Sequence, residues 1–180
     1  MPLYKAGIID YTWATKPSVA PIGQIICITD VGENGILCRG NGSKWIRMHP
    51  TTFYSLSTNV VLTGTTTETT LLTVPLVGGL LNKTGRLNIL SFLSFTNNAN
   101  AKTVKIKLGG NILAILNSTN QTTFSLNCWL LNLNSETSQR NNNAVSYAID
   151  TSIENDLVIT GQLANASDSI TLTAVSAEII

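Results

Sequence analysis

The side chains that could carry out chemistry are few in this chain of 180 residues, and their spacing does not combine them. A Ser-His-Asp relay would depend on the one histidine, His49, which stands beside Pro50 at the end of a predicted strand. No Gly-x-Ser-x-Gly nucleophile elbow occurs. A glycosidase would need a facing pair of carboxylates, but the acidic residues fall mostly in predicted turns, so a hydrolase is the weakest alternative. We therefore expect no catalytic residues and a protein that is not an enzyme.

Metal and cofactor sites have no sequence support either. Five acidic residues could supply oxygen ligands, but their spacing matches no calcium-binding loop of the EF-hand type: Asp30, Glu33, Asp150, Glu154 and Asp156. The Gly109-Gly110 pair lacks the lysine and the following helix of a phosphate-binding loop, and it is typical of a hairpin turn. We expect no metal ion and no cofactor.

The three cysteines, Cys27, Cys38 and Cys128, are an odd number and form no Cys-x-x-Cys pair. Cys27 and Cys38 lie directly opposite each other across a predicted hairpin if its turn centres on Gly32 and Glu33. Cys27 and Cys38 could then form a strained disulfide or supply half of the ligands of a metal site. Buried thiols that act as small apolar side chains are the simpler interpretation.

The chain combines an apolar composition with little charge. Charged residues make up 12% of it, against roughly 25% in ordinary soluble domains, and the mean hydropathy is +0.20. The net charge of +1 gives no basis for nucleic-acid binding, and we expect Lys102, Lys105 and Lys107 to form the solvent face of one strand. No apolar run approaches the roughly 18 residues of a membrane span, so no membrane insertion is expected. This composition indicates one part of a larger assembly.

The elements that must position these residues are short strands, because Thr and Asn are abundant and apolar residues alternate with polar ones. Residues 1–21 are predicted to form an extended docking arm, residues 22–56 a three-stranded β-meander, and residues 57–180 an antiparallel β-sandwich of jelly-roll type. Residues 51–58 are predicted to be a connection. The arm either docks on a partner or forms an edge strand of its own domain. The predicted fold class is all-β.

Two predicted strands of the sandwich are apolar on both faces. Residues 87–95 turn Leu90 and Phe92 away from the core face, and residues 124–133 do the same with Trp129 and neighbouring leucines. A sandwich has one core, so the second apolar face must be covered by a subunit interface or by the N-terminal unit. An interface is favoured, with three-fold association as the first expectation. The candidate interface residues, including two from the arm, are Tyr11, Trp13, Leu90, Phe92, Trp129, Leu131 and Leu133.

Several turn motifs resemble a family of proteins encoded by tailed bacteriophages. Residues 29–35 (TDVGENG) and 41–45 (NGSKW) are similar to a short module of that family, although Cys27 and Cys38 depart from its usual strand residues. Residues 63–70 (TGTTTETT) and the later turn motifs are similar to the β-domain that accompanies the module. The resemblance covers roughly residues 22–115 by motif and the rest by composition. These motifs are turn signatures, so they bear on architecture more than on activity.

The resemblance implies a virion accessory protein, of the kind found as capsid decoration proteins, head fibres or tail-associated proteins. It implies a trimeric β-sandwich whose partners are copies of itself and other virion proteins, such as major capsid or tail proteins. The expected location is the virion, after synthesis in the host bacterial cytoplasm, because the N-terminus lacks the apolar core of a secretory signal. The alternative function is a tail- or fibre-associated receptor-binding module that recognises bacterial surface glycan.

Overall fold

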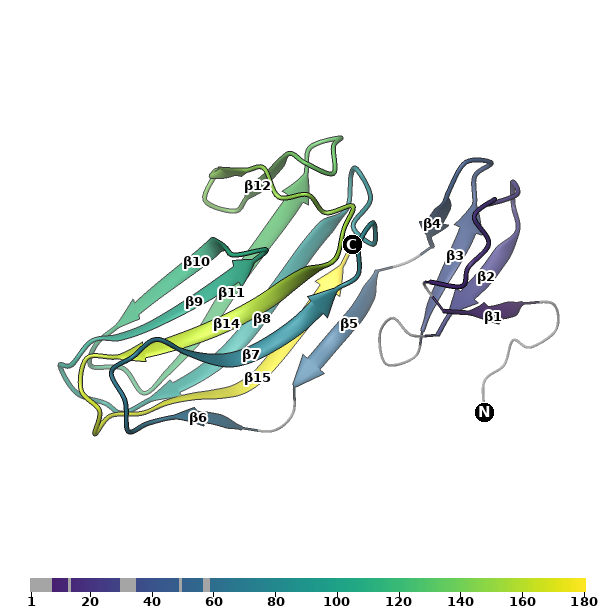
Figure 1. The fold of residues 1–180 in the computed structure, drawn as a ribbon. Coiled ribbons are helices and arrows are strands. Elements are labelled where there is room, and N and C mark those ends of the chain that lie inside the picture. Colours follow the sequence, from purple (N-terminus) through teal and green to yellow (C-terminus); the bar gives the residue numbers. More distant parts are fainter. Residues whose placement is uncertain (1–7, 13, 30–34, 49, 57–58) are drawn as a thin grey trace. The chain divides into compact units, whose positions relative to one another are not determined.

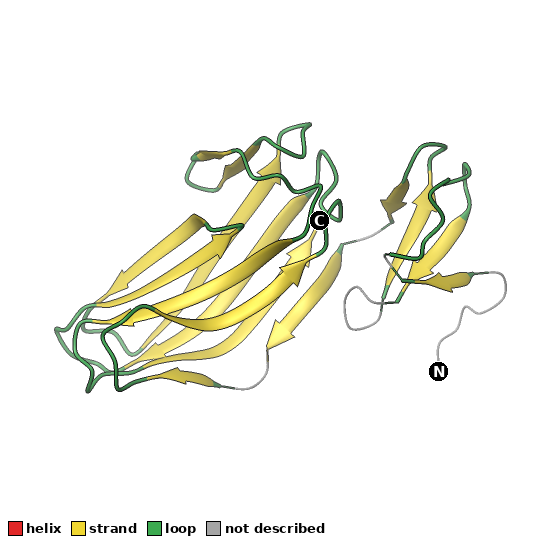
Figure 2. Ribbon diagram, viewed as in Figure 1, coloured by secondary structure: helices red, strands yellow, loops and turns green. Residues whose placement is uncertain are grey.

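The computed structural model of the chain describes residues 8–12, 14–29, 35–48, 50–56 and 59–180. All regular structure in these ranges is β, which confirms the all-β fold class (Figure 2). The chain divides into two compact units, one of residues 1–53 with 178–180 and the other of residues 54–177. The part of the chain that the structure describes contains no helix long and apolar enough to cross a membrane.

The first unit, called the module below, is built around a four-stranded sheet in the order β1-β2-β3-β4 (Figure 1). Strands β2 to β4 run antiparallel and form the predicted meander, whereas β1 is an additional edge strand that runs parallel to β2. Ile26, Ile28, Ile36 and Cys38 form the buried face, because side chains alternate along each strand. The strands are β1 (Ile9–Tyr11), β2 (Ile25–Ile28), β3 (Ile36–Gly40) and β4 (Trp45–Arg47).

Of the described residues before position 22, Ile9–Tyr11 form a strand of this sheet, and Pro17 and Ala20 pack within the same unit. Thr29 N donates a hydrogen bond to Tyr11 O at 2.8 Å, which fixes β1 beside β2. Trp45 Nε1 donates to Pro17 O at 2.8 Å, and Ala20 is fully buried. Residues 9–11 therefore form an edge strand of their own unit, the alternative considered from the sequence, while docking of this segment on a partner stays a prediction.

The second unit is a β-sandwich whose eight principal strands pair like a long hairpin folded over on itself. The first strand pairs with the last, the second with the seventh, the third with the sixth, and the fourth with the fifth. All four pairs are antiparallel, and successive pairs alternate between two sheets (Figure 1). This nested pairing is the jelly roll that the sequence predicts. In order of nesting, the pairs are β6 (Val60–Leu62) with β15 (Ile170–Ile179), β7 (Thr69–Leu76) with β14 (Asn155–Leu163), β8 (Arg86–Phe95) with β11 (Thr123–Asn132), and β9 (Lys102–Leu108) with β10 (Asn111–Ser118).

The two sheets enclose one core. One sheet has the order β10-β9-β14-β7, and the other has the order β13-β12-β11-β8-β15-β5, with β6 also paired to β15. Ile89, Ile106, Leu130 and Ile159 come from both sheets and are fully buried. The hairpin turn predicted at Gly109-Gly110 is confirmed, since both residues have positive φ (53° and 77°) as a type I′ turn requires.

Three further strands complete the larger sheet: β5 (Thr51–Leu56), β12 (Gln139–Asn141) and β13 (Ser146–Tyr147). The expectation of a connection at residues 51–58 is wrong for 51–56, and residues 57–58 lie outside the described part. The segment Thr51–Leu56 contains aromatic and β-branched residues that favour a strand once a neighbouring strand edge is free to pair. Strand β12 was not expected from the sequence, because its three residues are all polar.

Candidate interaction surface

The two strands predicted to be apolar on both faces, β8 and β11, lie side by side. Their antiparallel register pairs Leu90 with Asn127 and Asn88 with Trp129, so Leu90 and Trp129 are diagonal neighbours on one face. Phe92 and Leu131 continue that face, each two residues further along its strand. We call these four side chains, Leu90, Phe92, Trp129 and Leu131, the outer apolar strip. It runs from Phe92 on β8 to Leu131 on β11, where Arg86 of β8 and Arg140 of β12 pair with Leu131.

The strip faces away from the core of the sandwich. Phe92 is 44% exposed, while Leu90, Trp129 and Leu131 are half-buried. Leu133, directly after β11, has the same orientation and is 40% exposed. Residues on the inner face of the same strands, such as Leu87 and Leu130, are fully buried. The structure therefore brings five of the seven candidate residues onto one surface.

The two candidate residues from the predicted arm are not part of this strip. Tyr11 is half-buried in β1, which belongs to the module. Trp13 lies outside the described residues.

A shallow groove of about 540 Å³ lies beside Phe92 on the larger sheet. Four hydroxyl-bearing residues line the groove together with Phe92: Ser94, Thr123, Ser125 and Thr173. Thr173 Oγ1 donates a hydrogen bond to Phe92 O at 3.1 Å, which connects β15 to β8 here. The hydroxyls were not predicted, because Ser and Thr occur throughout the sequence and only the strand pairing gathers these ones.

The opposite outer face, on β9 and β14, is polar and its charges are paired. Glu68 accepts hydrogen bonds from Lys105 Nζ at 2.6 Å, from Lys107 Nζ at 2.6 Å and from Thr160 Oγ1 at 2.7 Å. We call these four residues the Glu68 clasp. The hydrogen bonds from Lys105, Lys107 and Thr160, in that order of size, lower the pKa of the Glu68 carboxyl to about 2. The clasp therefore holds the β6–β7 loop on the sheet with an ionised carboxylate.

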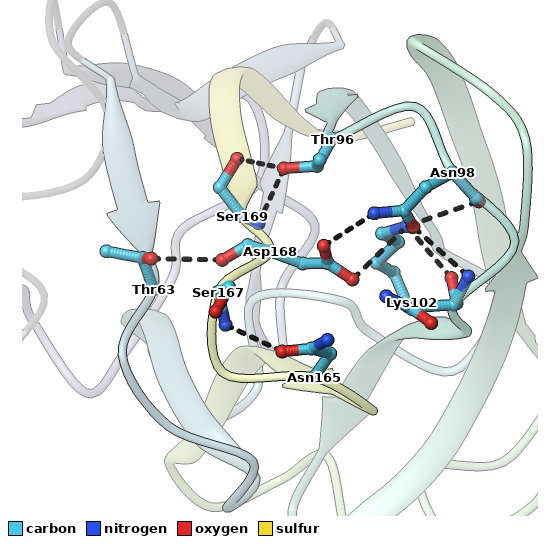
Figure 3. Close-up of polar contacts among 9 residues, drawn as sticks. Thr63, Thr96, Asn98, Lys102, Asn165, Ser167, Asp168 and Ser169 are labelled. Carbon is cyan, nitrogen blue, oxygen red and sulfur yellow. Dashed lines mark hydrogen bonds and ion pairs between the residues drawn. The ribbon is translucent and has the colours of Figure 1, made fainter.

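A buried ion pair joins the loops at one end of the sandwich (Figure 3). Lys102 Nζ lies 3.6 Å from Asp168 Oδ2, and the two side chains are 1% and 4% exposed. Lys102 Nζ also donates to Asn98 Oδ1 and to Asn100 O, the latter at 2.8 Å. Asn98 Nδ2 in turn donates to Asp168 Oδ1 at 2.7 Å. This hydrogen bond, together with the charge of Lys102, holds the pKa of Asp168 below its ordinary value.

The expectation that Lys102 faces solvent with Lys105 and Lys107 is wrong. Lys102 has the same strand parity as Val104 and Ile106, so its side chain points inward with theirs. Burial of an ammonium group is tolerated here because Asn98, Asn100 and Asp168 satisfy it. The alternation that groups Lys102 with Val104 and Ile106 is visible in the sequence. The ion-pair partner Asp168 is not, because it lies far along the chain.

The register of the module separates the two cysteines that seemed to be opposite each other. Cys38 pairs with Ile26 on the buried face, whereas Cys27 pairs with Leu37 on the other face. A register one residue away from the expected one moves a side chain to the opposite face of a sheet. None of the three cysteines is in a disulfide. Burial raises the pKa of the Cys38 and Cys128 thiols to about 11.

Among the residues that the structure describes, no group of three or more His, Cys, Asp or Glu side chains is placed to hold a metal ion. His49 lies outside the described part. What the described surface offers is the outer apolar strip, the groove at Phe92 and the polar loops held by the buried ion pair.

No protein-family model matches the chain, and no curated protein sequence matches it. Solved structures match only at low similarity. The CBM36-1 domain of a multidomain xylanase from the hindgut metagenome of Trinervitermes trinervoides is 10% identical, with a TM-score of 0.38, and the match covers 65% of this chain and 74% of that one.

The VP2 subviral particle of infectious bursal disease virus is 14% identical, with a TM-score of 0.41, and the match covers 92% of this chain. Latent PorU from Porphyromonas gingivalis is 9% identical, with a TM-score of 0.41, over 87% of this chain. The matches cover 40% of the VP2 chain and 14% of the PorU chain. TM-scores this low do not establish a shared fold, so the jelly-roll assignment rests on the strand pairings of the chain itself.

Proposed function

We propose that the chain is a non-enzymatic structural protein of a tailed-phage virion, which associates as a homotrimer and binds the capsid surface. The observation that carries the proposal is the outer apolar strip on β8 and β11. Contiguous exposed apolar surface is uncommon on soluble monomers and marks contact surfaces. The motif resemblance supports the virion as the setting of that contact.

The chemistry of the strip favours another copy of the same chain as the surface that covers it. Aromatic residues are enriched at the centres of protein interfaces, and charged residues are depleted there. The strip has two aromatic side chains. Its neighbours Asn88, Ser125 and Asn127 are neutral, while Arg86 and Arg140 lie beside it at its Leu131 end. Closed rotational symmetry would let every copy cover the same surface.

The mechanism would be stabilisation by mass action. A protein that binds the assembled shell and not its separate subunits shifts the equilibrium towards the shell, by an amount that grows with its concentration above the dissociation constant. No catalytic group takes part. The jelly roll supplies rigid strands, so the contact residues are ordered before binding and little conformational entropy is lost.

The direct test is to quantify the chain in purified virions and to locate it by electron microscopy. We expect it at three-fold or pseudo-three-fold positions of the capsid, in many copies for each particle. Absence from purified virions would contradict the proposal. A few copies at the tail alone would contradict capsid binding and favour the alternative function.

The alternative function, recognition of a bacterial surface glycan, has one observation in its favour. The groove at Phe92 combines an aromatic ring with four hydroxyl-bearing side chains, and sites for small polar ligands are typically an apolar surface with a few polar groups. Titration of the isolated protein with host surface polysaccharide tests this, with Phe92→Ala as the variant. Saturable binding that Phe92→Ala abolishes would favour the receptor-binding function.

A further inference from the structure

The sheet of the module has a second face that is apolar and carries a positive charge. Arg39 of β3 pairs with Ile46 of β4, and Leu37 and Met48 have the same orientation as this pair. Ile46 is 40% exposed and Met48 is 48% exposed. The opposite face of the same sheet is closed by residues of the 14–20 segment, with Ala20 fully buried. This module therefore has one covered apolar face and one uncovered one.

Ile22 adds an apolar side chain that a rigid turn holds towards solvent. Its side chain is 81% exposed, although the residue lies in a turn. In that turn Gln24 N donates a hydrogen bond to Pro21 O at 3.2 Å. Gly23 N donates to Gly40 O at 2.9 Å, and Gly42 N donates to Ala20 O at 2.9 Å. Because these bonds fix the backbone, Ile22 is presented without the entropy cost of ordering a loop on binding.

Ile22, Arg39, Ile46, Arg47 and Met48 line an open groove of about 480 Å³. Arg39 supplies the positive charge of this face, because Arg47 pairs with Cys38 and its side chain belongs to the buried face. None of the side chains lining the groove in the described part of the chain is a carboxylate. An arginine beside apolar surface forms strong, bidentate hydrogen bonds with a carboxylate. A second copy of this face is a poor occupant, because its lining carries the same positive charge and offers no carboxylate to Arg39.

We propose that this groove binds an acidic, apolar segment of another virion protein. An apolar side chain of that segment lies between Ile22, Ile46 and Met48, and a neighbouring carboxylate pairs with Arg39. The inference rests on the proposed function, and it divides the contacts between the two units. The strip on the sandwich joins copies of the chain, and the groove of the module attaches them to the particle.

The experiment measures binding of the purified full-length chain to particles that lack it, by co-sedimentation over a concentration series. Arg39→Glu and Ile22→Ser change the groove. Lys44→Glu is the matched charge reversal, since Lys44 is exposed on the same module and does not line the groove. Val61→Ser is the matched apolar control, since Val61 is 56% exposed on the sandwich. Thermal unfolding of each variant confirms that it is folded.

We expect Arg39→Glu and Ile22→Ser to weaken binding roughly tenfold or more each, and both controls to bind as the wild type does. A soluble peptide of alternating Leu and Glu should compete, and one of alternating Leu and Lys should not. If the wild-type chain does not bind particles, the proposed function fails. If it binds and Arg39→Glu binds equally well, or Lys44→Glu is weakened as much, the proposed function stands and the acidic partner at this groove is overturned.

Discussion

The two outer faces of the sandwich belong to one jelly roll but meet their surroundings in different ways. On β9 and β14, the Glu68 clasp pairs its charges within the chain, at distances of 2.6 to 2.7 Å. On β8 and β11, Leu90 and Phe92 of the outer apolar strip pair with the neutral Asn127 and Ser125, Arg86 and Arg140 flank only its Leu131 end, and Phe92 is 44% exposed. A face that satisfies its own polar groups is suited to water, whereas an apolar surface with charges only at its rim is suited to another protein surface. This difference is the reason why we propose that the assembly contact lies on β8 and β11.

The largest expected effect is on assembly, from removing the two aromatic side chains of the strip. The double variant Phe92→Ser with Trp129→Ser should weaken self-association by about 4 kcal/mol, or roughly 1000-fold, because buried aromatic anchors dominate interface energies. Analytical ultracentrifugation over a dilution series measures this. Ile115→Ser is the matched control, because Ile115 is 52% exposed on the opposite face beside Lys105. Equal weakening by the control would remove the distinction between the faces.

A slightly smaller effect, on the free energy of unfolding, is expected from the charge of Lys102, which is buried, whereas the charges of the Glu68 clasp are partly exposed. Lys102→Ala should lower the free energy of unfolding by about 3 kcal/mol, because it leaves Asp168 buried without its partner. Lys105→Ala on the polar face should lower it by only about 0.5 kcal/mol, since that pair is partly exposed. Urea unfolding of both variants decides whether the two charged sites differ as described. Equal losses would contradict the inward orientation of Lys102.

The acid response of the polar face is expected to be smaller still. The folded-state pKa of Glu68 is about 2, below its ordinary value of 4.5, so the ionised form is favoured in the folded protein. The stabilisation is complete above pH 4.5 and is lost as the pH falls towards 2. Relative to Glu68→Gln, the wild type should lose about 1 kcal/mol over this interval, since solvent screens a partly exposed site. Identical pH dependence of unfolding in the two proteins would contradict the clasp.

The smallest effect concerns the module, whose sheet also has a covered and an uncovered face. Cys27 is half-buried on the uncovered face, whereas Cys38 and Cys128 are buried with thiol pKa values near 11. A thiol reagent at pH 8 should therefore label one cysteine quickly in the folded protein and all three after unfolding. Peptide mapping identifies the labelled residue. Rapid labelling of Cys38 would show that the register or the covering segment differs.

The parts of the fold that depend on local alternation were predictable from the sequence. Val104, Ile106 and Leu108 alternate with polar residues, and Gly109-Gly110 marks the turn that follows them. Residues 87–95 and 124–133 have apolar side chains on both faces, and this pattern predicts an outer apolar surface on each strand. It does not show that the two strands are neighbours, which the structure does. Side-chain alternation is a property of single strands, so it needs no knowledge of the partner strand.

The parts that depend on distant partners were not predictable. Lys102 is buried because Asp168 and Asn98 meet it, and Asp168 is 66 positions away in the sequence. Cys27 and Cys38 project to opposite faces because the hairpin register differs by one residue from the symmetric one. The edge strand β1 pairs in parallel with β2, and parallel pairing leaves no short turn signal in the sequence.

The oligomeric state of the wild-type chain tests the central claim most directly. Light scattering coupled to size separation, at concentrations near roughly 1 μM, should give three times the chain mass of 19.3 kDa. Under the same conditions the Phe92→Ser, Trp129→Ser double variant should give the mass of one chain. A wild-type protein that stays monomeric throughout, with the strip exposed to solvent, would contradict the assignment of β8 and β11 to an interface between copies.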